Sequence, residues 1–179
     1  MICLTGDTYG NQILWDACIN NVLKEGDTII ILGHFGFGVF DGRYWPEKMF
    51  YDYLAEQKYA ALFIDGNHES FENYNSFPMG RWNGGRVQFI RKNVLHLMRG
   101  EIYCIGGKKV FCFGGGYSFD RDYRVPGKTW RPQEMPIDEE YKNATKDLEA
   151  CGFKVDYILT HTAPADICPG QVLELKTLL

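Results

Sequence analysis

The sequence predicts an α/β fold with a mostly parallel sheet, and three observations predict it. Short apolar runs alternate with segments of helical periodicity through the first half of the chain. The run at residues 28–32 is β-branched and apolar, which is typical of a strand covered on both faces, and 61–64 is a further strand candidate. Polar residues follow these runs directly, where strand passes into loop. Because open α/β sheets bind ligands at the carboxyl ends of their strands, we expect the functional site there.

The first half of the chain is expected to repeat strand, loop and helix. A strand at residues 2–5 precedes a helix that ends at Gly26. The apolar face of this helix is predicted from five residues at helical spacing: Ile13, Leu14, Ala17, Cys18 and Val22. A second helix is predicted over 46–58, with Pro46 in its first turn. This order favours right-handed crossovers between parallel strands.

After residue 86 the pattern changes to short strands separated by turns. They are expected at four ranges: 87–90, 94–97, 101–105 and 109–113. Their spacing predicts an antiparallel meander and hence a second sheet. A helix is then predicted from Asp138 to Gly152, with Ala144 and Leu148 on its apolar face. A last strand at 155–160 leads to His161.

Composition and charge exclude several classes of protein. Hydrophobic residues make up 45% of the chain and charged residues 23%, which is ordinary for a globular domain and excludes disorder. The net charge of −4 offers no basic surplus for broad nucleic-acid binding, and no apolar run is long enough to span a membrane. The six cysteines form no CxxC pair, and the N-terminus is a poor signal peptide. We expect a single cytoplasmic domain over residues 1–179.

Four predicted strand ends carry side chains that can bind a metal ion or move a proton. Asp7 follows the first strand and His34 the second. The third strand leads to Asn67 and His68, and the last leads to His161. Each alone is an ordinary turn residue, but four at successive strand ends favour a common site. Carboxylate, amide and imidazole ligands together suit Mn, Fe or Zn.

Two arginines beyond the triple glycine at 114–116 are candidates for substrate binding. Arg121 and Arg124 offer guanidinium groups that can bind a phosphate with two hydrogen bonds. The alternative is that both are surface ion-pair partners of Asp120 and Asp122.

The motifs resemble those of calcineurin-like metallophosphoesterases, especially small bacterial and phage members. Four stretches carry the likeness: GDTYG at 6–10, GHFG at 33–36, GNHE at 66–69 and LTHTAP at 159–164. The resemblance implies an α/β/β/α sandwich of two mixed sheets and metal-dependent hydrolysis of phosphomonoesters or phosphodiesters. It also implies that Asp7 binds one metal ion, that Asn67 and His161 bind the other, and that His68 acts on the leaving group.

Three departures from the family pattern predict weak or absent activity. Tyr9 stands where a histidine ligand is expected, and its hydroxyl keeps its proton near neutral pH. His34 stands where a carboxylate bridges two ions, and a neutral imidazole offers only one lone pair. No GHxH motif precedes Leu179, so we expect the second sheet to lack its C-terminal strands. We therefore expect at most one divalent ion to bind well, with four available ligands: Asp7, His34, Asn67 and His161.

Other interpretations stay open at this point. The chain could be a non-catalytic module that binds a phosphorylated ligand or a protein partner on the same fold, or an incomplete product. For either function the expected partner is a phosphorylated small molecule or a nucleotide. An incomplete second sheet, or the apolar residues of 171–179, could also pair with another copy to form a homo-oligomer.

Overall fold

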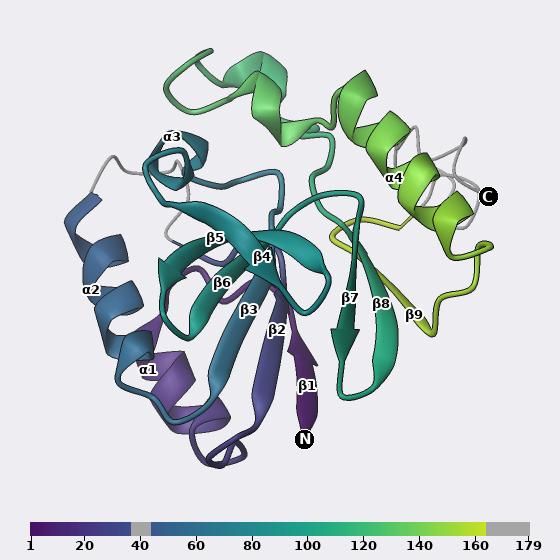
Figure 1. The fold of residues 1–179 in the computed structure, drawn as a ribbon. Helices are drawn as coiled ribbons and strands as arrows, with labels where there is room; N and C mark the ends of the chain where they lie inside the picture. Colours follow the sequence, from purple (N-terminus) through teal and green to yellow (C-terminus); the bar gives the residue numbers. More distant parts are fainter. Residues whose placement is uncertain (37–43, 164–179) are drawn as a thin grey trace.

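The structure, a computed structural model, describes residues 1–36 and 44–163. These residues form four layers. A six-stranded and a three-stranded sheet form the two middle layers, and helices cover their outer faces (Figure 1). Both sheets mix parallel and antiparallel strands. The predicted α/β fold with two mixed sheets is therefore confirmed.

The six-stranded sheet has the order β1-β2-β3-β6-β5-β4. Its strands are β1 (Ile2–Thr5), β2 (Thr28–Leu32), β3 (Ala60–Ile64), β4 (Met79–Trp82), β5 (Gly85–Arg91) and β6 (Val94–Leu97). Strands β1, β2, β3 and β6 run parallel to one another. The carboxyl ends of β1, β2 and β3 consequently lie side by side at one edge.

The structure corrects the predicted meander. Strands β5 and β6 pair antiparallel as expected, but β6 also pairs with β3 and so belongs to the first sheet. Every residue of β6 is buried, which suits an interior strand. The spacing of short strands indicates hairpins, but it does not indicate which sheet a hairpin joins.

Strand β4 is an additional element that the sequence analysis missed. It forms a hairpin with β5 through Asn83 and Gly84, which have φ angles of 47° and 104°. An Asn-Gly pair with positive φ at both residues is the preferred two-residue hairpin turn. This dipeptide was the available signal.

The second sheet has three strands within the described residues, in the order β7-β8-β9. Strands β7 (Glu101–Ile105) and β8 (Lys108–Phe113) form a hairpin, and β9 (Tyr157–Thr160) lies parallel to β8. Helix α4 (Asp138–Ala150) packs Ala144 and Leu148 against the outer face of this sheet, as predicted. The crossover through α4 returns the chain to the site edge, where β9 ends before His161.

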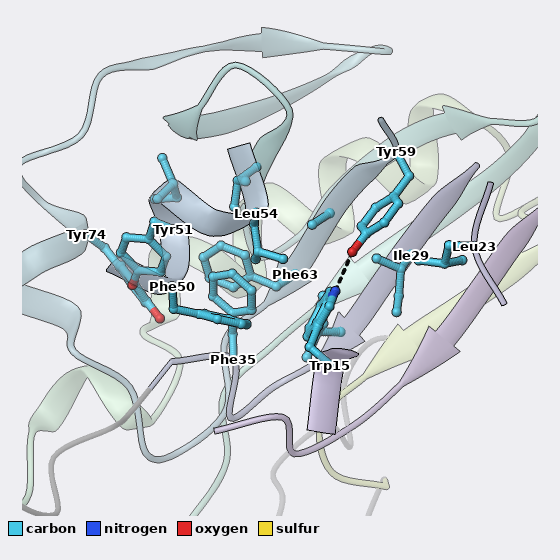
Figure 2. Close-up of a cluster of buried hydrophobic side chains, with 14 of the residues drawn as sticks. Trp15, Leu23, Ile29, Phe35, Phe50, Tyr51, Leu54, Tyr59, Phe63 and Tyr74 are labelled. Carbon is cyan, nitrogen blue, oxygen red and sulfur yellow. Dashed lines mark hydrogen bonds between the residues drawn. The ribbon is translucent and has the colours of Figure 1, made fainter. Parts of the chain in front are cut away.

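The first helical segment forms, but its predicted apolar face is wrong. Helix α1 (Gln12–Leu14) continues as a π-helical turn at Trp15–Ile19. Ile13 is 82% exposed, whereas Trp15 is fully buried and donates its indole N–H to the hydroxyl of Tyr59 (Figure 2). The wider π turn departs from the 3.6-residue period on which the prediction rested.

The remaining helices are α2 (Tyr44–Ala55) and α3 (Phe71–Tyr74), with 3₁₀ turns at Arg121–Tyr123 and Pro132–Glu134. Helix α2 starts two residues before and ends three residues before the predicted helix at 46–58. No helix in the described ranges is long and apolar enough to cross a bilayer. The segment predicted to self-associate, 171–179, lies outside the described residues.

An aromatic cluster beneath the site edge holds the β2 and β3 ends together. Phe35, the residue after His34, is fully buried, and its ring stacks on Phe63 of β3 with 4.0 Å between centroids (Figure 2). Phe50 and Tyr51 of α2 pack against the same ring. Because dense packing resists displacement, the cluster fixes the backbone that carries His34.

Candidate metal centre

The loops after β1 and β2 are joined by backbone hydrogen bonds. The N–H of Tyr9 donates to the carbonyl of His34 at 2.8 Å, and that of Asp7 donates to Gly33 at 3.2 Å. Asp7, Tyr9 and His34 all have φ near +50°, in the left-handed region. Such backbone conformations concentrate at functional sites because they require support from the surrounding fold.

Two glycines leave room for the histidine rings. A β-carbon at Gly33, whose φ is +98°, would lie 2.2 Å from Nδ1 of His161. A β-carbon at Gly66 would lie 2.8 Å from the ring of His34. Glycine at both positions therefore allows the two imidazoles to approach one another, with 4.5 Å between ring centroids.

The amide oxygen of Asn67 is the point at which the two histidines converge. Nε2 of His34 lies 2.8 Å from Oδ1 of Asn67, and Nε2 of His161 lies 3.1 Å from the same oxygen. These side chains come from the ends of β2, β3 and β9. The structure thus brings together three of the predicted ligands, whose roles as ligands stay predictions.

The ring of His161 presents a lone pair to this point. Its Nδ1 lies 2.6 Å from the carbonyl oxygen of Leu32, which can only accept a hydrogen bond, so Nδ1 carries the hydrogen. Burial lowers the pKa of His161 and so favours the neutral ring. Nε2 then has no hydrogen to donate to Asn67.

The ring of His34 is held in a similar way. Its Nδ1 lies 2.8 Å from the hydroxyl of Tyr9 and 3.2 Å from a carboxylate oxygen of Asp7. Because a carboxylate only accepts, Asp7 favours a hydrogen on Nδ1 and a lone pair on Nε2. Carboxylate–histidine pairs of this kind orient imidazole ligands at metal sites.

The three atoms that meet here, Nε2 of His34, Oδ1 of Asn67 and Nε2 of His161, form a donor set whose chemistry suits a divalent transition metal ion. With hydrogens on both Nδ1 atoms and the amide oxygen of Asn67 facing the rings, all three atoms present lone pairs to one another. That arrangement suits a cation between them. Imidazole nitrogen and amide oxygen are ligands that Mn, Fe and Zn accept, and three protein ligands suffice for a catalytic zinc ion. The side chain of Asp7 is 57% exposed and contacts Nδ1 of His34, the ring nitrogen that does not face Asn67. Across the described residues no three His, Cys, Asp or Glu side chains are grouped to hold an ion.

His68 lies beside the donor set rather than in it. Its ring stacks on that of His34 with 5.1 Å between centroids, and its Nε2 is 3.8 Å from Asp120. Burial and the nearby charge of Arg124 lower the pKa of His68 to about 4. The ring is therefore largely neutral at pH 7.

The two candidate substrate-binding arginines differ in environment. The side chain of Arg124 is buried and pairs with Glu134 at 3.0 Å and with Asp120 at 3.5 Å. Arg121 is half-exposed, with its guanidinium 5.0 Å from the ring centroid of Trp130. The side chain of Arg124 therefore belongs to the interior, and only Arg121 is open to solvent.

Glu69 also supports the site. It belongs to the GNHE motif, but the sequence analysis gave it no role. One of its carboxylate oxygens accepts the N–H groups of Phe35 at 3.2 Å and Gly66 at 3.0 Å. The other accepts the hydroxyl of Tyr74 at 2.8 Å. Burial raises the pKa of Glu69 to about 7. This single carboxylate ties the turn after His34 to the turn before Asn67.

Asp65, at the end of β3, is held by a second buried network. It pairs with Arg99 and with Nε2 of His96, the latter at 2.8 Å. Although burial opposes ionisation, Arg99 and His96 hold the pKa of Asp65 well below its usual range. No motif in the sequence marked these partners, because they come from β6 and the loop after it.

Comparison with known proteins identifies the family. Residues 1–173 match the model of the calcineurin-like phosphoesterase family. The chain belongs to the calcineurin-like phosphoesterase family. Membership supports a phosphoester hydrolase as the kind of protein, and divalent-metal binding is a trait of this family. Searches of curated proteins and of solved structures gave no significant match.

Proposed function

We propose that this calcineurin-like phosphoesterase hydrolyses phosphomonoesters or phosphodiesters slowly, with one divalent transition metal ion. The observation that carries the proposal is the convergence of two histidine rings on one amide oxygen: Nε2 of His34 and Nε2 of His161 lie 2.8 and 3.1 Å from Oδ1 of Asn67. A small phosphorylated molecule or a nucleotide is the proposed substrate. When bound, a divalent ion supplies Lewis-acid polarisation and a water of lowered pKa.

The protein's own residues would orient and stabilise the substrate. Asn67, His34 and His161 would hold the ion, while Asp7 and Leu32 fix the orientation of the two imidazoles through their Nδ1 atoms. His68, which stacks on His34, would stabilise charge on the leaving group. Arg121 offers a half-exposed guanidinium for phosphate oxygens.

Two features make a low rate the expected outcome. With a pKa of about 4, His68 rarely carries the proton that a leaving group needs at neutral pH. The carboxylate that bridges two ions in the family is replaced by His34, so the charge that would hold a second ion is missing.

The test is turnover of bis(p-nitrophenyl) phosphate with added Mn²⁺. We expect slow, chelator-sensitive hydrolysis that Asn67→Ala and His161→Ala abolish and that His68→Ala reduces. Asn21→Ala changes an exposed asparagine and should leave the rate unchanged. The double variant Tyr9→His/His34→Asp, which restores the family's ligand types, should raise the rate.

The opposite result would favour the non-catalytic alternative. Absence of both turnover and bound Mn²⁺ would exclude the proposed activity. Saturable binding of inorganic phosphate in chelator would then support a module that recognises phosphorylated ligands without hydrolysing them.

A further inference from the structure

The donor set works only if the amide of Asn67 turns its oxygen, not its NH₂ group, toward the histidines. The two ends of an amide have nearly the same shape, so packing alone does not choose between them. What differs is hydrogen bonding at the far end. There, Nδ2 of Asn67 donates to the hydroxyl of Ser118 at 2.9 Å.

Ser118 accepts from Asn67 because its own hydrogen is directed elsewhere. A serine hydroxyl has one hydrogen and two lone pairs. Its hydrogen is donated to the carboxylate of Glu134, and Nη1 of Arg124 donates to the oxygen at 3.0 Å. Because Arg124 can only donate, it occupies one lone pair of the Ser118 oxygen. The second lone pair is left for another N–H donor. The NH₂ end of Asn67 is the group that fits.

Glu134 fixes the direction of the whole chain of hydrogen bonds. Its side chain is fully enclosed, with the residue 1% exposed, and Ser118 is 2% exposed. One carboxylate oxygen accepts from the N–H of Arg131 at 3.1 Å and from Arg124 at 3.0 Å. Burial raises the pKa of Glu134, and the guanidinium of Arg124 opposes that rise. The ion pair keeps Glu134 an acceptor for Ser118.

We propose that Ser118, Glu134 and Arg124 are positioning residues that hold the oxygen of Asn67 toward His34 and His161. This inference rests on the proposed function, because it concerns the same metal site. It gives Arg124 a role in supporting the donor set instead of contacting substrate. Partners of this kind, one step removed from the ligands, commonly set metal affinity.

The test is a titration of the purified protein with Co²⁺, followed by calorimetry and by the visible spectrum of the bound ion. Ser118→Ala removes the acceptor for the NH₂ group of Asn67. Glu134→Gln directs an NH₂ group at Ser118, so that the serine hydrogen turns to Asn67 and favours the flipped amide. We expect each change to weaken Co²⁺ binding about 10- to 100-fold and to alter the spectrum.

Glu101→Gln is the matched control. Glu101 is also buried, also pairs with an arginine, Arg86, and also accepts a backbone N–H, but it lies in β7. Its replacement should leave Co²⁺ affinity unchanged. Circular dichroism checks that each variant is folded, and Ser118→Ala carries the test if Glu134→Gln does not fold.

The variant Asn67→Asp serves as a second starting protein, which distinguishes a positioning role from a general loss of structure. In Asn67→Asp both side-chain oxygens accept, so the orientation of the group no longer matters. Adding Glu134→Gln or Ser118→Ala there should not weaken Co²⁺ binding further. Equal weakening in both backgrounds, or none in the parent, would overturn the inference while leaving the proposed function standing. A parent protein that binds no Co²⁺ would overturn both.

Discussion

Tyr9 and His34, the two residues that depart from the family's ligand pattern, contact each other. The hydroxyl of Tyr9 lies 2.8 Å from Nδ1 of His34, and the ring centroids are 5.0 Å apart. Tyr9 therefore supports the imidazole that replaced the bridging carboxylate. Under the proposed function, this pair favours one bound ion where the family pattern has two.

Glu69 should make the stability of the metal-free protein depend on pH. Because burial raises its pKa from 4.5 to about 7, the folded protein keeps this proton in a range where the unfolded chain has lost it. The free energy of unfolding should fall as pH rises from 4.5 to 7, by about 3 kcal/mol from this group. Glu69→Gln should remove that component, as measured by urea unfolding in chelator across this range.

The exposed Glu25 provides the control for this measurement. Glu25→Gln should leave the pH dependence as it is, because its side chain is 78% exposed and solvent screens its ion pair with Lys58. An identical slope in Glu69→Gln and the parent would show that Glu69 ionises normally in the folded state.

At the residue scale, the sequence predicted the side chains that follow strands and missed those that support them. His34, Asn67 and His161 were found because each comes directly after an apolar run. Ser118 and Glu134 lie in a long polar loop, where nothing in the local pattern distinguishes a buried partner from a solvated one. Their roles depend on contacts across 51 and 16 positions of the chain.

At the element scale, the segment Gln12–Ile19 shows that apolar spacing alone does not identify the buried face of a helix. Trp15 is fully buried against the aromatic cluster, with 5.3 Å between its ring centroid and that of Phe50. Trp15→Ala should lower the free energy of unfolding by about 3–5 kcal/mol, because it leaves a large cavity. Urea unfolding followed by circular dichroism measures the change.

Ile13→Ala is the matched comparison on the opposite side of the same segment. Ile13 is exposed, so its replacement should change stability by less than about 0.5 kcal/mol. Equal losses of unfolding free energy in the two variants would instead support the apolar face predicted from the sequence spacing.

The strands were more predictable than the helices and the pairing. The runs at 28–32 and 94–97, apolar except for Thr28 and His96, mark β2 and β6 to the residue, because strands covered on both faces carry mostly apolar side chains. The partner of β6 was not predictable, since β3 lies about 30 residues earlier in the chain and sequence spacing carries no information on such pairing.

At the scale of the whole molecule, the site is a product of the topology. Parallel pairing of β1, β2 and β3 places their ends at one edge, and the crossover through α4 brings β9 beside them. The two sheets pack through a shared core that includes Ile30, Leu62, Tyr103 and Leu159. Because the donors come from both sheets, they meet only when this core has formed.

The count of bound ions tests the central claim most directly. Protein incubated with Mn²⁺, freed of excess metal and examined by native mass spectrometry should carry one ion per chain, and Asn67→Ala should carry none. Two ions per chain, or a single ion that persists in Asn67→Ala, would contradict a site built from His34, Asn67 and His161.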